Sequence, residues 1–405
     1  MIRNRDIIIV GLQPWDIEIG SNCKNIAAVM ARTNRVLYVN RALDRISAIR
    51  DRNDAKTRTR KSSIAGQASD LQLIAPNLWT LDPRTILESI NWIPFAGLFD
   101  RLNRINNKRM ANAINDAAAR LGFSDPLLFI DNDFFRAFYL PEMISGVSGT
   151  IYYIRDNLTS QPYFQRHGLR LEPQLMAKST VVVANSAWLA SYGRKHNPAS
   201  FDIGQGCDFS WLDNVGPEAP SLLKENGKPV IGYVGALIAS RLDIGLMEDI
   251  AARRPDWQFL LVGPEDEAFR QSPLHTMPNV LFTGNRPSSE LPSWIQSFDV
   301  CINPQLVNPM TIGNYPRKID EYLAFGKPVA ATATEAMEMF ASYVYLCKGA
   351  GEYIDAIAKG LREHDETLRE RRKAFALSHT WENSLAALEA ALTSVSTQPK
   401  TVQHG

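Results

Sequence analysis

The chain has 405 residues, of which 45% are hydrophobic and 21% charged, and its net charge is +1 at neutral pH. This length and composition are typical of a globular protein with two domains and exclude a disordered chain. The four cysteines (Cys23, Cys207, Cys301 and Cys347) form no CxxC pair, which argues against a zinc site or a disulfide framework and favours a reducing cytoplasm. No apolar run reaches the roughly 18 residues that a transmembrane helix needs.

Charge is distributed unevenly along the chain. Residues 1–214 carry 26 Lys and Arg against 20 Asp and Glu, a net charge of +6, so the remainder carries −5. A basic first half predicts contact with an anionic surface or substrate. Much of the excess lies in the polar segment 41–63, for which we expect a mobile loop.

A second feature of the first half is the segment 86–110, where apolar and aromatic residues adjoin cations. This pattern is typical of a segment that contacts a membrane surface. A core helix with a solvated basic end explains it equally simply. The apolar residues are Trp92, Ile93, Phe95, Leu98 and Phe99, and the cations are Arg101, Arg104, Lys108 and Arg109.

Strand-like runs alternate with helical patterns along the whole chain. Continuous Val, Ile and Leu runs separated by helices predict parallel strands buried on both faces, and therefore two doubly wound α/β domains of the Rossmann-like kind. In the first half we expect strands at 6–12, 35–40, 126–131, 150–156 and 180–186, and helices at about 21–32, 100–121, 162–177 and 186–196. In the second half we expect strands at 230–237, 257–263, 280–284, 299–304, 328–332 and 343–347.

The predicted domain boundaries follow from composition. We expect one domain over 1–213, a linker over 214–228 that is rich in Pro, Gly and Asn, and a second domain over 229–380. An amphipathic helix over 381–395 is expected to pack back toward the first domain, followed by a disordered tail over 396–405. No GxGxxG motif follows a strand and no GxxxxGK[ST] motif is present, so neither a dinucleotide cofactor nor a P-loop is supported.

The residues that follow the strands of the second half point to an anion site, because ligands bind beyond the carboxyl ends of parallel strands. Gly235 and Gly263 each follow a strand, and Arg241 is expected at the start of a helix. Lys318 is expected at the start of another helix. Two cations near helix N-termini suit a diphosphate, and Glu321 can accept hydrogen bonds from sugar hydroxyls.

Five segments of the second half resemble, in their order along the chain, the nucleotide-sugar domain of GT-B glycosyltransferases. They are GYVGAL, WQFLLVGP, NVLFTGNRPSSELP, FDVCINP and PRKIDEYLAFGKPV. They are most similar to the family 4 (group 1) type that builds bacterial cell-surface polysaccharides. The resemblance covers 228–360 well and implies two Rossmann-like domains facing each other across a cleft. It also implies that Glu321 binds the ribose hydroxyls, while Arg241 and Lys318 neutralise the diphosphate.

One position departs from the family pattern. Many family 4 enzymes have a second glutamate eight positions before the first, and this chain has Gly313 there. That glutamate binds the donor sugar, so the departure concerns sugar identity and anomeric outcome. Thr311 and Asn314 are the neighbouring candidates for contacts with the sugar hydroxyls.

The resemblance makes the first domain the acceptor side. Gly20, Ser21 and Asn22 lead into the first helix and are expected to face the acceptor and the donor phosphates. Trp15 suits stacking on a sugar ring or packing in the core. Further along, Asp156 is the best candidate for a general base or, alternatively, a helix cap, with Arg155 and His167 nearby on the acceptor side.

The sequence FIDND, with Asp131, Asn132 and Asp133, looks like a DxD metal motif of a different glycosyltransferase fold. GT-B enzymes usually need no metal, so we expect neither a metal nor another cofactor. The expected reaction is transfer from a nucleotide-diphosphate sugar to a glycan or lipid-linked acceptor, with retention favoured over inversion, in the cytoplasm or at the inner membrane face. Nucleic acid is not an expected partner. A nucleotide-sugar epimerase and a non-catalytic sugar-binding subunit are the alternatives.

Overall fold

The computed structural model describes residues 2–17, 20–214 and 227–396, and the chain divides into two compact units. The first comprises Met1–Gly204 and Trp381–Gly405, and the second comprises Gln205–Thr380. The first boundary lies before the expected one at 213, because 205–212 pack on the second unit: the Cys207 amide donates to the His379 carbonyl oxygen at 2.8 Å, and Phe209 and Trp211 pack against that unit's core. Most of the expected linker (215–226) and tail (397–405) lies outside the described residues.

The first unit is built on an eight-stranded sheet with the order β10-β9-β8-β7-β1-β2-β5-β4. All neighbouring strands are parallel except β4, which is antiparallel to β5. A short two-stranded sheet pairs β3 with β6. The strands are β1 (Asp6–Val10), β2 (Arg35–Val39), β3 (Leu43–Asp44), β4 (Leu71–Ala75), β5 (Leu78–Leu81), β6 (Ile86–Leu87), β7 (Leu127–Asp131), β8 (Gly149–Ile154), β9 (Val181–Ala184) and β10 (Ser200–Asp202).

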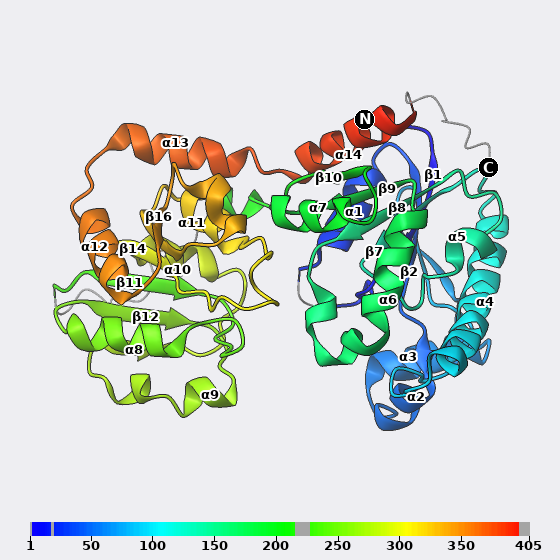
Figure 1. Ribbon diagram of the computed structural model, residues 1–405, viewed down its shortest axis with the longest axis horizontal. Helices are drawn as coiled ribbons and strands as arrows, with labels where there is room; N and C mark the ends of the chain where they lie inside the picture. Colours follow the sequence, from blue (N-terminus) through cyan, green and yellow to red (C-terminus); the bar gives the residue numbers. More distant parts are fainter. Residues whose placement is uncertain (1, 18–19, 215–226, 397–405) are drawn as a thin grey trace. The chain divides into compact units, whose positions relative to one another are not determined.

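Helices cover both faces of this sheet. Residues of α4, α6 and α7 form one core with alternate strand residues such as Ile8 and Val10, and α1 and α14 form the other with Ile7 and Ile9. Helix α14 packs on α1 and β9 (Figure 1). The helices are α1 (Asn22–Met30), α2 (Arg45–Arg50), α3 (Ala55–Ile64), α4 (Ala96–Arg120), α5 (Leu140–Met143), α6 (Pro162–Lys178), α7 (Ala187–Arg194) and α14 (Trp381–Ser396).

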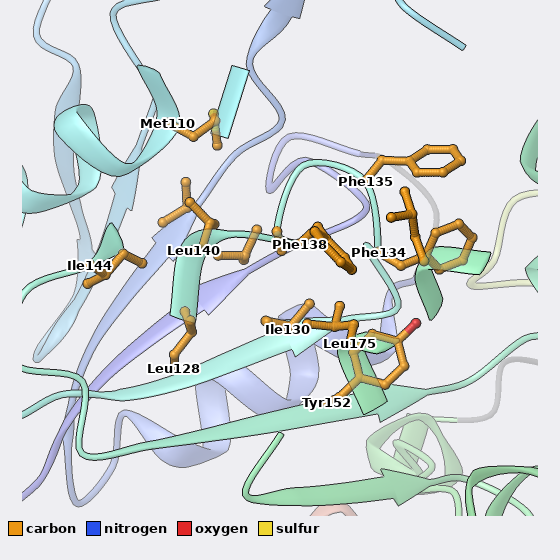
Figure 2. Close-up of a cluster of buried hydrophobic side chains, with 14 of the residues drawn as sticks. Met110, Leu128, Ile130, Phe134, Phe135, Phe138, Leu140, Ile144, Tyr152 and Leu175 are labelled. Atoms are coloured by element: carbon orange, nitrogen blue, oxygen red, sulfur yellow. The ribbon is translucent and has the colours of Figure 1, made fainter. Parts of the chain in front are cut away.

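Aromatic side chains dominate the first core beside the carboxyl end of β7. Figure 2 shows Ile130 of β7 and Tyr152 of β8 on the same side of the sheet as Phe134 and Phe138. Phe134 and Phe135 pack edge to face, with ring centroids 4.8 Å apart. Because such packing fixes the backbone, the loop that follows β7 is held rigidly at the edge where ligands bind in parallel sheets.

The polar segment 41–63 is not the loop that we expected, because it forms α2 and α3. Each helix is capped by an aspartate: Asp44 accepts from the Ser47 amide at 3.1 Å, and Asp54 accepts from the Thr57 amide at 2.8 Å. These caps satisfy amides that would otherwise lack partners. The two helices were not predicted because the high charge of the segment is typical of a loop.

The second unit contains a six-stranded parallel sheet with the order β13-β12-β11-β14-β15-β16, the doubly wound arrangement expected from its sequence. The strands are β11 (Val230–Val234), β12 (Gln258–Val262), β13 (Val280–Phe282), β14 (Val300–Asn303), β15 (Val329–Thr332) and β16 (Tyr345–Cys347). The helices are α8 (Ile244–Arg253), α9 (Glu267–Arg270), α10 (Leu291–Ser297), α11 (Lys318–Ala324), α12 (Ala350–Leu361) and α13 (Glu366–Leu377).

Within the described residues, no helix has the length and apolar character needed to cross a membrane.

Candidate functional site

The strand order of the second sheet reverses between β11 and β14, and a ligand crevice is expected beyond their carboxyl ends. Two loops meet there. The amide of Leu306, after β14, donates to the carbonyl oxygen of Arg241 at 2.9 Å, and Asn308 donates to the Ser240 carbonyl oxygen at 2.9 Å. The crevice is therefore bordered by the loops 235–243 and 304–317.

Lys318 reaches back across this crevice to the end of β11. Its ammonium donates to the hydroxyl of Tyr233 and lies 3.9 Å from the centre of that ring. Burial lowers the pKa of Lys318 to about 7, with Glu321 opposing the shift and Arg241 adding to it. Burial also raises the pKa of Tyr233, and Arg241 opposes that rise. Arg241 therefore influences the pKa values of both Lys318 and Tyr233.

Gly235 and Gly263 allow the ends of β11 and β12 to approach each other closely. Both have positive φ, +139° and +149°, values that favour glycine. A Cβ on Gly235 would lie 2.7 Å from the Lys318 Nζ, and one on Gly263 would lie 2.1 Å from the Gly235 carbonyl oxygen. Gly235 thus makes room for the ammonium, while Gly263 makes room for Gly235.

Arg241 does not begin a helix as we expected, because α8 starts at Ile244 with Asp243 as its cap. Arg241 lies in the preceding turn with an exposed side chain. Among the described residues, no carboxylate lies within ion-pair distance of Arg241. Asp243, two residues further on, accepts from the Leu246 amide at 2.9 Å. An exposed guanidinium without an acidic partner can bind an anion.

Glu321 pairs with Arg317 and not with Lys318. Its Oε1 lies 3.5 Å from the Arg317 Nε, and both side chains are partly exposed. Burial raises the pKa of Glu321, although Arg317 and Lys318 oppose the rise. Since a carboxylate accepts several hydrogen bonds, Glu321 keeps the capacity to accept from a diol.

The loop before α11 contains the two residues that we predicted as sugar contacts. The Thr311 hydroxyl donates to the Leu306 carbonyl oxygen and accepts from the Asn308 amide at 3.1 Å, so it stabilises the loop. By contrast, the Oδ1 of Asn314 is buried without a hydrogen-bond partner among the described residues, as is the Nδ2 of Asn303 at the end of β14. Gly313, between them in the loop, is buried.

In the first unit, Arg155 and Asp156 follow β8 and form a charged cluster with Asp131. The Arg155 Nε donates to Asp131 Oδ1 at 2.8 Å, and its Nη1 donates to Asp156 Oδ2 at 3.2 Å. Asp131 is fully buried, whereas the side chain of Asp156 is partly exposed. Arg155 thus compensates a buried carboxylate, and Asp156 is the most exposed member of the cluster.

Asn132 fixes the backbone of this cluster. It adopts the left-handed conformation, φ +53°, and its Oδ1 accepts from the amides of Arg155 and Asp156, each at 3.0 Å. Its Nδ2 lies 3.4 Å from Oε1 of Glu172, which also accepts from the Tyr152 hydroxyl at 2.8 Å. Burial raises the pKa of Glu172 to about 7.

Both aspartates of the FIDND sequence are engaged by neighbouring side chains or amides of the first unit. Asp131 binds Arg155, and Asp133 caps the following turn while accepting from the Arg136 Nε at 2.6 Å. In the described residues, no group of three His, Cys, Asp or Glu side chains is arranged to hold a metal ion.

The loop after β1 contains the other acceptor-side candidates. Ser21 precedes α1, and its buried hydroxyl has no partner among the described residues. Asn22 donates to the Tyr153 hydroxyl at 3.3 Å, and Gly20 is exposed. Trp15 packs edge to face on Tyr38, with centroids 5.1 Å apart, and is half-buried. It therefore serves the core on one side and remains accessible on the other.

His167 lies in the core of the first unit. It is 4% exposed, its Nε2 is 2.8 Å from the Ile93 carbonyl oxygen, and its ring stacks on Phe99. The ring of His167 therefore contacts Ile93 and Phe99 of its own unit.

Two residues of the crevice were missed by the sequence interpretation, namely Tyr233 and Arg317. Tyr233 reads as an ordinary core residue of β11, and only its hydroxyl contact with Lys318 shows its second role. Arg317 adjoins Lys318 in the sequence, and its i,i+4 spacing from Glu321 was the available signal.

Comparison with known proteins gives the second unit a family match. Residues 228–363 match the family described as Glycosyl transferases group 1. The chain is also 30% identical over 243 residues to a protein of Bacillus subtilis (strain 168) named as a teichuronic acid biosynthesis glycosyltransferase, TuaH. That alignment covers 56% of this chain, and the chain spans 60% of the length of TuaH.

Solved structures match over nearly the whole chain at low sequence identity. Sucrose-phosphate synthase from Thermosynechococcus elongatus has a TM-score of 0.65 and 17% identity, covering 98% of this chain and 100% of its own. Anabaena HepE, solved in complex with UDP, has a TM-score of 0.62 and 15% identity, covering 96% and 100%. Trehalose-6-phosphate synthase from Burkholderia multivorans has a TM-score of 0.64 and 11% identity, covering 97% and 99%. These similarities show that the fold is that of GT-B proteins.

Proposed function

We propose that this chain, whose residues 228–363 match the family described as Glycosyl transferases group 1, transfers a sugar from a nucleotide-diphosphate sugar to a glycan or lipid-linked acceptor. The product would be part of a cell-surface polysaccharide, as the name of the Bacillus relative suggests. The observation that carries this proposal is the crevice of the second unit, where Lys318, Arg241 and Glu321 adjoin the switch point of the sheet.

In the proposed reaction, the acceptor hydroxyl attacks the anomeric carbon while the nucleoside diphosphate leaves. Lys318 and Arg241 stabilise the negative charge that develops on the leaving group, and Glu321 accepts hydrogen bonds from the ribose hydroxyls. Preorganised charges of this kind often supply the largest part of catalysis. We propose that the two cations serve in place of a metal. The complex of HepE with UDP makes uridine the first nucleotide to test.

The proton of the acceptor can leave by two routes. In a retaining reaction, which we favour, the departing phosphate accepts it. In an inverting reaction Asp156 accepts it as a general base, consistent with its partly exposed carboxylate beside Arg155. Asn314, with its buried and unpartnered Oδ1, is the proposed contact for a donor-sugar hydroxyl.

Titration calorimetry with UDP and a panel of UDP-sugars tests the donor site. We expect Glu321→Ala and Lys318→Ala each to weaken UDP binding roughly tenfold to a hundredfold, because each removes a charged hydrogen-bonding group. The exposed Glu338 and Lys359 provide the matched controls Glu338→Ala and Lys359→Ala. Unchanged UDP affinity in both site variants would show that the donor lies elsewhere, and conversion of the donor sugar without an acceptor would indicate an epimerase.

We also propose that the first unit contacts an anionic membrane surface. Trp92 and Phe95 are 67% and 72% exposed, next to the exposed cations Arg101 and Arg104. The Trp92 carbonyl oxygen accepts from Arg166 at 2.8 Å, so α6 adds a cation to the same surface. Exposed aromatic side chains flanked by cations suit a bilayer with anionic headgroups.

Flotation with liposomes tests this contact. We expect binding to vesicles that contain phosphatidylglycerol, weaker binding to purely zwitterionic vesicles, and loss of binding in the Trp92→Ala/Phe95→Ala variant. Leu73 on β4 is comparably exposed, so Leu73→Ala is the control for general loss of surface hydrophobicity. Equal flotation of the double variant and the wild type would contradict the proposal.

A further inference from the structure

Two arginines lie at the ligand-binding edge of the first sheet. Arg41 follows β2 and Arg136 follows β7, so both lie at the carboxyl end of parallel strands on either side of β1. Arg41 is 47% exposed and Arg136 is 17% exposed. Their positive charges repel each other, because Arg136 is the main cause of a lowered pKa of Arg41, ahead of burial.

The acidic groups near this pair are already engaged. Asp133 accepts from the Arg136 Nε at 2.6 Å and from the Arg136 amide at 3.0 Å. Asp44 caps α2 and lies 3.9 Å from the Arg41 Nη2. The Nη1 of Arg136 is buried and has no hydrogen-bond partner among the described residues. A buried guanidinium nitrogen without a partner costs free energy unless an acceptor binds to it.

Arg41 also lines a pocket of about 570 Å³ whose wall includes Pro14, Lys56 and Arg60. The other guanidiniums of this wall are neutralised within the unit: Arg60 donates to Asp16 at 2.7 Å, and Arg50 donates to Asp51 at 2.8 Å. Arg41 differs from them, because its ion-pair partner Asp44 lies 3.9 Å away, beyond hydrogen-bond distance.

We propose that Arg41 and Arg136 bind a phosphate or diphosphate ester of the acceptor. This inference rests on the proposed glycosyltransferase function and specifies the acceptor class. Two guanidiniums offer paired donors that match phosphate oxygens, and an anion between them would relieve their mutual repulsion. The site lies in the first unit and is separate from Lys318 and Arg241.

The surroundings indicate that the phosphate is attached to a lipid. Tyr163, at the start of α6, contributes to the electrostatic environment of Arg41 and is exposed. One turn later on the same helix, Arg166 contacts the Trp92 carbonyl oxygen. The arginine pair thus adjoins, through the first turns of α6, the exposed apolar surface of Trp92 and Phe95. An acceptor with a charged group and a long apolar chain satisfies both.

Binding of short prenyl compounds tests the site directly. The measurement is titration calorimetry with farnesyl diphosphate, inorganic diphosphate and farnesol, with saturating UDP present so that the donor site is occupied. We expect farnesyl diphosphate to bind most tightly, and Arg41→Gln and Arg136→Gln each to weaken it roughly tenfold. Arg32→Gln makes the same charge change after the carboxyl end of α1, at the opposite edge of the sheet, and is expected to bind as the wild type does.

The outcomes separate this inference from the proposed function. Retained UDP binding in Arg41→Gln together with lost farnesyl diphosphate binding supports the acceptor site. Wild-type affinity for farnesyl diphosphate in Arg41→Gln overturns the acceptor site. Because the Arg41 side chain is exposed, this variant is expected to fold as the wild type does. Equal affinities for inorganic and farnesyl diphosphate overturn the lipid part and indicate a water-soluble phosphorylated acceptor. If the wild type does not bind UDP, the donor site is contradicted. The affinities of the Arg41 and Arg136 variants for farnesyl diphosphate still test the acceptor site.

Discussion

Lys318 is the residue whose environment differs most from that expected for a surface lysine. It extends under Gly235 and contacts Tyr233, and its burial brings its pKa to about 7. Near neutral pH the free protein therefore contains both protonated and neutral forms of this side chain. A bound diphosphate favours the protonated form, so ligand binding and proton binding are coupled at this residue.

This coupling predicts that UDP binding takes up protons above pH 7. The pKa of Lys318 rises when the diphosphate binds, so affinity is expected to fall as pH increases from about 7 to about 9. Calorimetry at pH 8 in two buffers with different ionisation enthalpies measures the uptake. Lys318→Gln should lose most of it, whereas Lys359→Gln should retain it. Identical binding enthalpies in both buffers for the wild type would exclude the coupling.

At the scale of residues, the sequence predicts which residues belong to the candidate site but not the pairings within it. Glu321 and Lys318 were recognisable from the family pattern, because they share one short motif. Their contacts with Arg317 and Tyr233 depend on side-chain direction and on which strand end lies opposite, and neither follows from local spacing alone. The fully engaged hydroxyl of Thr311 and the unpartnered Oδ1 of Asn314 likewise look equivalent in the sequence.

At the scale of elements, α6 connects a buried carboxyl group to the Arg155–Asp156 turn. Glu172 of α6 is 1% exposed and accepts from the hydroxyls of Tyr152 on β8 and Tyr192 on α7. Asn132 joins this group to the backbone of Asp156. The orientation of the turn therefore depends on a group that titrates near neutral pH.

This arrangement predicts a pH-dependent stability of the first unit. The pKa of Glu172 is raised to about 7 in the folded protein, so the folded state binds more protons than the unfolded state between about pH 4.5 and 7. The contribution of Glu172 is fully present below that window and is lost as pH rises through 7. We expect Glu172→Gln to raise the melting temperature at pH 8 relative to the wild type and to flatten its pH dependence.

Differential scanning calorimetry at pH 5.5 and pH 8 checks this expectation. Glu142 forms an exposed ion pair with Lys178, so Glu142→Gln is the control for loss of a carboxylate at the surface. If the melting temperature of Glu172→Gln depends on pH as that of the wild type does, a group other than Glu172 causes the pH dependence.

Strands that form continuous apolar runs were mostly predictable, whereas exposed strands, the short buried strand β5 and the charged helices were not. All six strands of the second sheet were expected, because each is a continuous apolar run buried on both faces. Strand β4 was missed because its residues are largely exposed, and α2 and α3 were missed because Asp44 and Asp54 act as caps within a segment that reads as a charged loop. Caps of this kind are visible only when the neighbouring amides are known.

At the scale of the whole molecule, the first unit is assembled from two distant parts of the chain. Trp381, Leu385 and Leu388 of α14 are buried in the same core as Ile26 of α1. Each large apolar side chain that is fully buried contributes roughly 1.5–3 kcal/mol. The exposed ion pair between Arg32 and Glu382 adds little to this.

Ending the chain at Thr380 is therefore expected to destabilise the first unit by several kcal/mol while leaving the proposed donor site of the second unit in place. Calorimetric melting should show a lower or lost transition, and titration with UDP should still detect binding. A chain that ends at Ser396 keeps α14 and is the control. Retention of the wild-type melting profile after removal of α14 would show that this helix contributes little.

The discontinuous first unit also affects the order in which the protein folds during synthesis. The ribosome makes residues 205–380 before it makes α14, at roughly 5–20 residues per second, so the apolar face of α1 that α14 covers stays without its partner while the entire second unit emerges. The second unit, encoded without interruption, has all its strands and helices available before α14 is made. A nascent chain is thus expected to become competent to bind nucleotide before its first unit, the proposed acceptor side, is complete.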